Sequence, residues 1–117
     1  MHNFRKLAVW QKSKDIGNEI FALCTQVRDS KAKIIAAQLI RSALRISATI
    51  AEGCGKSTRG ENIRYLNIAA GSAAETEHHL TVAMETGILP ADRCAALLAR
   101  TQQVSRIEKL IRKLPQD

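Results

Sequence analysis

Three consecutive residues, Gly55, Lys56 and Ser57, match the end of the phosphate-binding loop G-x-x-x-x-G-K-[ST]. In that loop, backbone N–H groups and the lysine side chain hold the phosphates of a nucleotide. The pattern requires a first glycine at position 50, where this chain has isoleucine, and a strand before the loop, where it has a helical pattern. We therefore interpret the three residues as a helix end followed by a solvated loop.

A second candidate is the step Glu75-x-x-His78, because di-iron helical bundles use this spacing to place two metal ligands on one helix face. Such sites need a second copy of the step and two more glutamates, and only Glu19 and Glu52 are plausible additional acids. His78 and His79 are adjacent, so their side chains point about 100° apart and cannot face the same ion. We therefore expect no metal and no other cofactor, and interpret these side chains as surface residues.

The candidate nucleophiles are the three cysteines, Cys24, Cys54 and Cys94. Nucleophilic catalysis needs a base beside the thiol, and no histidine is near any of them in the sequence. Their positions beside apolar helical residues are typical of small core residues, so we expect no enzymatic activity. An odd number of widely spaced cysteines indicates free thiols in the cytoplasm. We expect neither a signal peptide nor an apolar run of about 18 residues that could span a membrane.

The chain is basic, with 18 lysine and arginine residues against 11 acidic ones, a net charge of +7 and a pI near 9.8. This charge suits a polyanionic partner such as RNA or DNA, although a basic protein need not have one. The cations expected to contact phosphates, if there is such a partner, are Lys12, Lys14, Arg41, Arg45, Lys56 and Arg59. Aromatic residues are few, with Trp10 and Tyr65 the candidates for stacking, so we expect weak recognition of single-stranded bases.

Two arginines and one glutamate share a side of one predicted helix. Arg41 and Arg45 are one turn apart, and Glu52 lies two turns beyond Arg45. Two interpretations remain open. The three side chains form an exposed, partly paired face, or Glu52 is buried and paired with one of the arginines, within one chain or between subunits.

Apolar residues recur every three or four positions in four stretches, which is typical of amphipathic helices. We predict helices over approximately residues 9–27, 31–52, 61–86 and 90–114. Gly53 and Gly55 are expected to end the second helix in the left-handed conformation that glycine readily adopts, and Gly87 to end the third. Four long helices with short connections predict an all-α fold, an antiparallel up-down four-helix bundle, in a single domain over residues 1–117.

The second predicted helix, which Asp29 or Ser30 is expected to cap, carries two neighbouring apolar stripes. Their members are Ile35, Leu39, Ala43, Ile46 and Ile50, and beside them Ile40, Leu44, Ser47 and Ala51. This apolar face is wider than the core of one small bundle requires, which favours contact with another subunit, with deep burial within one chain as the alternative. In the third helix, residues 69–74 have little side-chain bulk, so other helices are expected to approach it closely.

Several short motifs together resemble a known family. They are Phe4-x-x-Leu7-x-Val9-Trp10-Gln11-Lys12, Gln38-Leu39-Ile40-Arg41-Ser42-Ala43, Ile50-Ala51-Glu52-Gly53 and Tyr65-Leu66-x-Ile68-Ala69-x-Gly71-Ser72-x-x-Glu75. With these motifs the chain resembles the four-helix bundle family encoded in intervening sequences of bacterial large-subunit ribosomal RNA genes, which is also likened to the accessory proteins of diversity-generating retroelements. Structural roles are expected for the motif residues Trp10, Gln38, Arg41, Glu52, Gly53, Gly71, Ser72 and Glu75.

The chain departs from this family in three places. It has Thr49 where asparagine is common, Val27-Arg28-Asp29 where Phe-Pro is frequent, and Gly53-Cys54-Gly55-Lys56 in place of Gly-Phe-Gly-Arg. The resemblance implies a bundle that assembles as a ring of copies, a homopentamer, without catalytic residues. It also implies a role with RNA or DNA, or with a protein partner such as a polymerase. Five copies would carry a charge of about +35.

Overall fold

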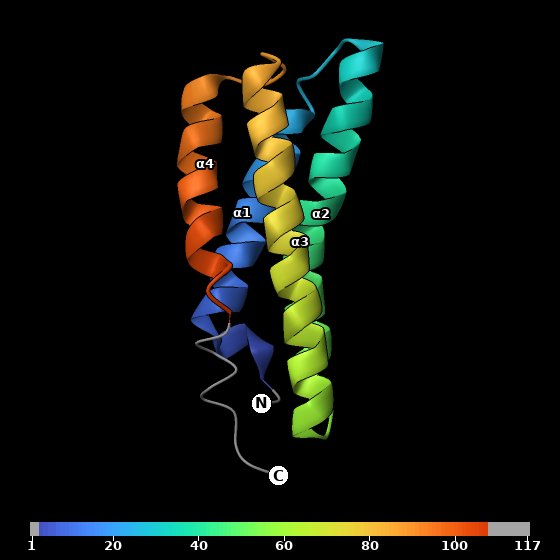
Figure 1. The fold of residues 1–117 in the computed structure, drawn as a ribbon, viewed down its shortest axis with the longest axis vertical. Coiled ribbons are helices and arrows are strands. Elements are labelled where there is room, and N and C mark those ends of the chain that lie inside the picture. The colour runs from blue at the N-terminus through green and yellow to red at the C-terminus, as the bar shows by residue number, and fades with distance from the viewer. Residues whose placement is uncertain (1–2, 108–117) are drawn as a thin grey trace.

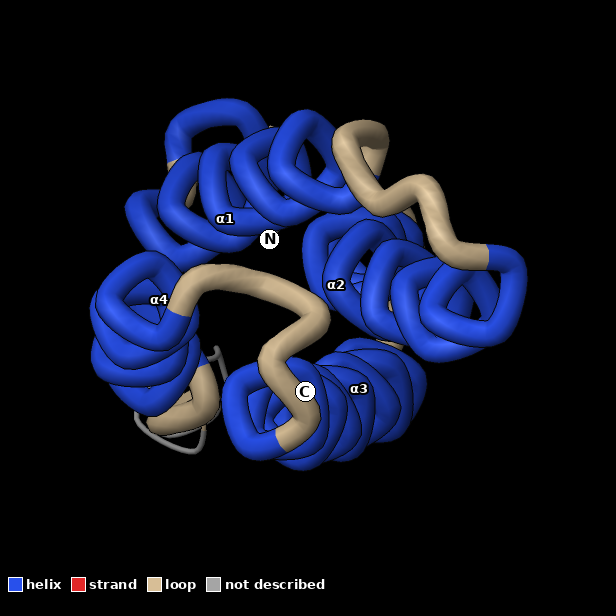
Figure 2. The backbone as a smooth tube through the Cα atoms, turned by 90° about the horizontal axis from the view of Figure 1, so that it is seen from above, coloured by secondary structure: helices blue, strands red, loops and turns tan. Residues whose placement is uncertain are grey.

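The computed structural model describes residues 3–107, which form four α-helices preceded by a short 3₁₀-helix, η1 (Phe4–Lys6) (Figure 1). The α-helices are α1 (Ala8–Cys24), α2 (Ser30–Cys54), α3 (Arg59–Glu85) and α4 (Ala91–Val104). Each helix packs against the next in the chain, and α4 also packs against α1, so that the four surround one core (Figure 2). No strand occurs in this described part. The predicted all-α, antiparallel up-down four-helix bundle is therefore confirmed.

The bundle is elongated, with extents of 50 × 21 × 20 Å. Its longest helices are α2 and α3, with 25 and 27 residues, against 17 in α1 and 14 in α4. We call the end formed by residues 3–14 and 52–65 the basal end. It contains η1, the start of α1 and the α2–α3 turn, and lies at the bottom of Figure 1.

The core consists of two groups of buried aliphatic side chains. The group away from the basal end includes Ile16, Ile20, Leu39, Leu80 and Leu97. The group nearer the basal end contains Ile46, Ile50, Cys54, Leu66, Ala69, Ala73 and Ile107, with Phe4 and Trp10 partly buried against it. Burying one such aliphatic side chain stabilises the fold by about 1.5–3 kcal/mol. Many of these buried side chains lie on the periodic apolar faces that the sequence predicts.

The end of α2 differs from the prediction. Gly53 lies inside the helix and is buried, and Gly55 has an ordinary φ of −81° rather than a left-handed one. A Cβ added at Gly53 would lie 2.8 Å from Cβ of Tyr65 on α3, closer than side chains approach one another. The predicted left-handed helix end is therefore wrong for both glycines. Gly53 is required instead by the close approach of α3.

Gly87 does end α3 as predicted. Its φ is +74°, its N–H donates to the carbonyl of Met84 (3.2 Å), and the N–H of Ile88 donates to the carbonyl of Ala83 (3.1 Å). These two bonds satisfy carbonyl groups at the end of α3 and are typical of a helix closed by a left-handed glycine. The chain can then turn directly into α4.

The N-terminus of α2 is capped by Asp29, one of the two residues predicted for this role. Its Oδ2 accepts hydrogen bonds from the N–H groups of Lys31 (3.0 Å) and Ala32 (2.9 Å), while Ser30 is the first residue of the helix. These bonds satisfy two N–H groups that have no partner within the helix. The predicted cap is confirmed.

The fourth helix is shorter than predicted. It ends at Val104 rather than near residue 114, and the residues that follow, up to Ile107, are not helical. At this end the Ser105 hydroxyl donates to the carbonyl of Gln102 (2.9 Å). The rest of the predicted helix, residues 108–114, lies outside the described residues.

Candidate nucleic-acid interface

A buried asparagine fixes the turn between α2 and α3. Nδ2 of Asn62 donates to the carbonyl oxygens of Gly53 (2.6 Å) and Lys56 (3.1 Å), which lie at the end of α2 and just beyond it. Thr58 caps α3 by accepting a hydrogen bond from the N–H of Glu61 (3.2 Å). Sequence reasoning missed Asn62. The available signal was its position four residues before Leu66, which places a polar side chain on the buried face of α3.

This turn holds a tyrosine between two cations. Tyr65 lies half-buried against Gly53, with the Lys56 ammonium 5.0 Å and the Arg64 guanidinium 5.3 Å from the ring centroid. A cation within about 6 Å of an aromatic ring is attracted by the negative face of that ring. Lys56 is a predicted phosphate contact and Tyr65 a predicted stacking residue. The structure places the Lys56 ammonium over the Tyr65 ring.

A second group of rings and cations lies at the start of the chain. Phe4 and Trp10 pack edge to face, with ring centroids 5.0 Å apart. The Arg5 guanidinium lies 4.6 Å from the Phe4 centroid, and the Lys14 ammonium lies 5.5 Å from the Trp10 centroid. Lys14 also forms an ion pair with Asp15 (3.3 Å). The basal end thus contains three of the chain's four Phe, Trp and Tyr residues, each with a cation nearby.

The charged residues predicted on α2 form an exposed face. Arg41, Arg45 and Glu52 are all exposed, as is Gln38, and none of the three charged side chains takes part in an ion pair within residues 3–107. The hypothesis that Glu52 is buried and paired within one chain is therefore wrong. Pairing between subunits stays a prediction.

The six predicted phosphate contacts do not form one patch. Four of them, Lys12, Lys14, Lys56 and Arg59, lie at the basal end, while Arg41 and Arg45 lie halfway along α2. Sequence spacing identified the cations but not their division between the side of α2 and one end of the bundle.

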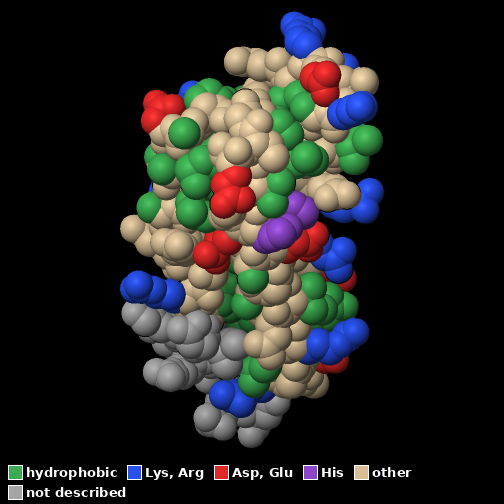
Figure 3. Space-filling view, turned by 45° about the horizontal axis from the view of Figure 1, so that its top comes forward, with side chains coloured by type: hydrophobic (Ala, Val, Ile, Leu, Met, Phe, Trp, Pro, Cys, Tyr) green, Lys and Arg blue, Asp and Glu red, His purple; other side chains and the backbone are tan. Residues whose placement is uncertain are grey.

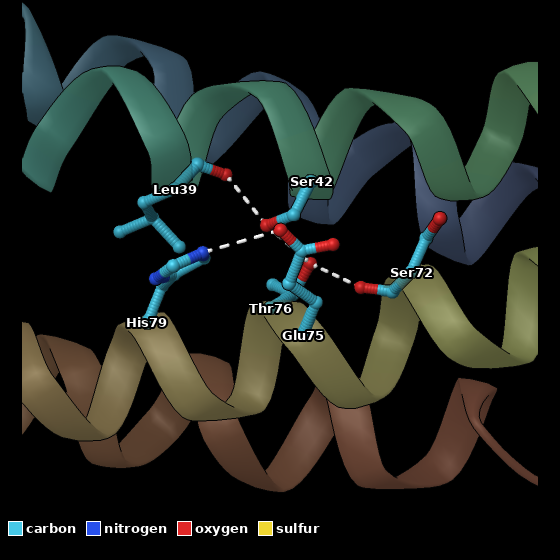
Figure 4. A network of polar contacts seen from close by, with 6 residues as sticks. All are labelled: Leu39, Ser42, Ser72, Glu75, Thr76 and His79. Atoms are coloured by element: carbon cyan, nitrogen blue, oxygen red, sulfur yellow. Dashed lines mark hydrogen bonds and ion pairs between the residues drawn. The ribbon is translucent and has the colours of Figure 1, made fainter.

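A polar contact joins α2 and α3 inside the bundle (Figure 4). The Thr76 hydroxyl lies 2.9 Å from the Ser42 hydroxyl and 2.8 Å from the carbonyl of Ser72, and the Ser42 hydroxyl lies 3.2 Å from the carbonyl of Leu39. The Ser42 and Thr76 hydroxyls therefore each have a partner, which a buried polar group needs to avoid a loss of stability. The motif residue Ser72 contributes to this contact through its backbone.

Glu75, a motif residue and predicted metal-ligand candidate, is exposed and pairs with His79 (3.4 Å) rather than with His78. In Figure 3 the two histidines (purple) lie among acidic side chains on the surface shown. Glu19 forms an ion pair with Arg100, which joins α1 to α4. Among residues 3–107, no three His, Cys, Asp or Glu side chains gather closely enough to hold a metal ion.

Gly71, the other motif glycine, has a different environment from Gly53. It is exposed, and a Cβ added there would meet no atom within 4 Å. The small residues Ala69 and Ala73 are buried, as the prediction of close helix approach requires, whereas Ala74 is exposed. Within residues 3–107, the small size of Gly71 therefore serves no contact.

The three cysteines are buried free thiols. Burial, with the nearby Cys94 as a smaller cause, raises the pKa of the Cys24 thiol from its ordinary 9.0 to about 11, and burial also raises the pKa values of Cys54 and Cys94. A raised pKa disfavours the reactive thiolate. These positions agree with the predicted role as core residues.

The raised thiol pKa values predict a loss of stability in alkaline solution. The unfolded chain releases the Cys24 proton near pH 9.0 and the folded chain only near 11, so the free energy of unfolding should fall as pH rises through this interval and be unaffected below it. Urea denaturation at pH 8 and pH 10.5 measures this fall. The variant Cys24→Ala should show a smaller fall. An equal fall in both proteins would contradict the prediction.

One helix has the composition of a membrane span. Within residues 3–107, α2 alone is long and apolar enough to cross a membrane, with a mean hydropathy of 1.4 over 18 residues. This differs from the expectation that no stretch of the chain would be apolar enough to do so. Core helices of soluble bundles share this length and composition. Arg41 and Arg45 lie midway along α2, where charges are costly in a bilayer. Only 39% of the apolar stretch is buried, so much of it faces outward from the bundle.

Comparison with known proteins agrees with this architecture. The sequence model of a family described as 23S rRNA-intervening sequence protein matches residues 5–109. The crystal structure of a protein of unknown function of the S23 ribosomal protein family from Bacteroides thetaiotaomicron VPI-5482 has a similar fold, with a TM-score of 0.83 and 25% identity. The match covers 89% of this chain and 98% of that one. No curated protein shows significant similarity to the chain.

Proposed function

Because this chain belongs to the 23S rRNA-intervening sequence protein family, we propose that it is a non-enzymatic, self-associating helical bundle that binds RNA or DNA in the cytoplasm. The observation that carries the proposal is the exposed surface of α2, which combines apolar side chains with unpaired charges. Apolar surface favours association with a second copy, and association multiplies the positive charge available to a polyanion.

The apolar part of this surface consists of large side chains that the single chain leaves exposed. Ile34 and Leu44 on α2 are 63% and 40% exposed, and Phe21 on α1 is 50% exposed. Leu44 lies beside Gly17, where α1 and α2 meet. Large apolar side chains on neighbouring helices are typical of surfaces that a partner covers. We propose that sister copies cover them, in the homopentamer that the family resemblance implies.

The charged part of the surface fits the same arrangement. Arg41, Arg45 and Glu52 are exposed on α2, with no ion pair to each other or to the rest of residues 3–107. Opposite charges without partners on one face can pair between two copies of that face. Such pairing selects a binding orientation more than it adds affinity.

The experiment combines light scattering with a nucleic-acid shift assay on the same purified protein. We expect a particle mass several times 12.9 kDa, and an affinity for RNA or DNA that falls about 10³-fold or more between 50 and 200 mM salt if six or more phosphates are contacted. Leu44→Glu should reduce the particle mass, whereas the control Gln102→Glu on the exposed side of α4 should not. A 12.9 kDa particle, or no shift at 50 mM salt, contradicts the corresponding part of the proposal.

The same exposed apolar side chains support a second candidate, an adaptor that docks a partner protein such as a polymerase without touching nucleic acid. Protein partners bury apolar surface, whereas phosphate contacts do not require it. A pull-down that survives nuclease treatment, together with a negative shift assay at low salt, would favour this candidate over the first.

A further inference from the structure

The basal end concentrates both charge and aromatic rings. Its two segments, 3–14 and 52–65, contain seven basic and two acidic residues. The segments at the opposite end of the bundle, 22–33 and 83–94, contain four basic and three acidic residues and no Phe, Trp or Tyr. The one such aromatic away from the basal end is Phe21, and no cation lies over its ring within the described residues. The pairing of rings with cations is therefore a property of one end.

Rings and cations side by side fit an unpaired nucleotide. A base stacks on an aromatic ring with a stabilisation of about 1–3 kcal/mol, whatever its sequence, while a cation beside the ring contacts the adjoining phosphate. At Tyr65 the Lys56 ammonium and the Arg64 guanidinium lie over the ring, 5.0 and 5.3 Å from its centroid. Both groups end flexible side chains, so a stacking base would displace them from the ring towards its own phosphate. A duplex offers such a surface its phosphates but no free base face for stacking, because its bases are already stacked on one another.

From this arrangement we propose that the basal end binds unpaired nucleotides of RNA or DNA, with Tyr65 and Trp10 as stacking surfaces and Lys56, Arg64 and Lys14 as phosphate contacts. The proposal rests on the nucleic-acid function proposed above and names the form of nucleic acid recognised. It also revises the expectation of weak base recognition. The aromatic residues are few, but the fold brings three of the four to one end.

The surface is held rigidly, as stacking requires. The Cβ of Tyr65 lies close against Gly53, and the two Asn62 hydrogen bonds hold the turn that carries Lys56. Trp10 is partly buried against the core and packs on Phe4. A preformed surface loses little conformational entropy on binding, so more of the stacking energy contributes to affinity.

The test compares a 12-nucleotide oligo(U), a 12-nucleotide oligo(dT) and a 12-base-pair DNA duplex by fluorescence anisotropy at low salt. Tyr65→Leu should weaken binding of the single strands about tenfold and change duplex binding less than about twofold. Tyr65→Phe, which keeps the ring, should stay within about twofold of the native affinity. Trp10, the chain's one tryptophan, should be quenched by single strands.

A second pair of variants tests the site independently, in case Tyr65→Leu does not fold. Lys56→Gln should weaken single-strand binding more than Lys33→Gln, an exposed lysine at the opposite end. If the native protein binds neither single strands nor duplex, the proposed nucleic-acid function fails. The second outcome starts from a native protein that binds both single strands and duplex. If Tyr65→Leu and Lys56→Gln then weaken the two kinds of binding equally, or weaken neither, the proposed basal site is wrong. The broader nucleic-acid function would still stand. Loss with either single strand, or with both, without a matching loss with the duplex supports the site.

Discussion

Replacing Asn62 by alanine is expected to lower the free energy of unfolding by about 2–3 kcal/mol. The side chain donates to the carbonyls of Gly53 and Lys56, and each such bond contributes about 1–1.5 kcal/mol. The side chain is buried, so its removal also leaves the Gly53 carbonyl without this donor in a place that water reaches poorly. Urea denaturation followed by circular dichroism measures the change.

Asn67→Ala is the matched control, because Asn67 is an exposed asparagine on the same helix. Its replacement should change the free energy of unfolding by less than about 0.5 kcal/mol, because the side chain is exposed. Alanine has a higher helix propensity than asparagine, so no loss of helix stability is expected. Equal effects of the two substitutions would show that the Asn62 hydrogen bonds do not hold the turn. The proposed basal site would then lose the rigidity assigned to it.

Gly53→Ala is expected to lower the free energy of unfolding by about 1–3 kcal/mol, although alanine normally stabilises a helix relative to glycine. The new methyl group would lie 2.8 Å from Cβ of Tyr65. That atom belongs to the rigid start of the side chain, so α3 must shift to make room. Thermal or urea denaturation of the purified variant gives the change.

Gly71→Ala separates this steric effect from helix propensity. A Cβ at Gly71 meets nothing within 4 Å, so this variant should be more stable than the native chain by up to about 1 kcal/mol. The two substitutions are chemically identical and opposite in predicted sign. If both stabilise the protein, the close approach of α2 and α3 at Gly53 is not a constraint.

The fold could be predicted from the sequence because its signals are local. Apolar residues such as Leu39 and Ile46 recur at helical spacing, and both are fully buried. Asp29 and Gly87 act at the helix ends where their chemistry indicates. The end of α4 was misplaced because the apolar pattern of the sequence continues past Val104, whereas the helix does not.

The candidate site could be predicted only in part, because it depends on contacts between helices. Lys56 and Tyr65 were both identified from residue type, but nothing in the spacing places the ammonium over the ring. Gly53 was recognised as special and given the wrong reason, since the obstruction comes from Tyr65, which is 12 positions further along the chain. The outward position of Glu52 depends on which side of α2 packs against α3. Periodicity alone does not decide this side, because the apolar face of α2 is broad.

The order in which the helices pack has a consequence for how the chain acquires its structure. Each helix rests on its neighbour in sequence, so most of the bundle forms by closing short loops, which is typical of domains that fold within microseconds to milliseconds. The exception is the contact of α1 with α4, where Glu19 meets Arg100 across 81 positions. During synthesis α1, α2 and α3 can therefore associate before α4 is available, and the arrival of α4 completes the enclosure of the interior.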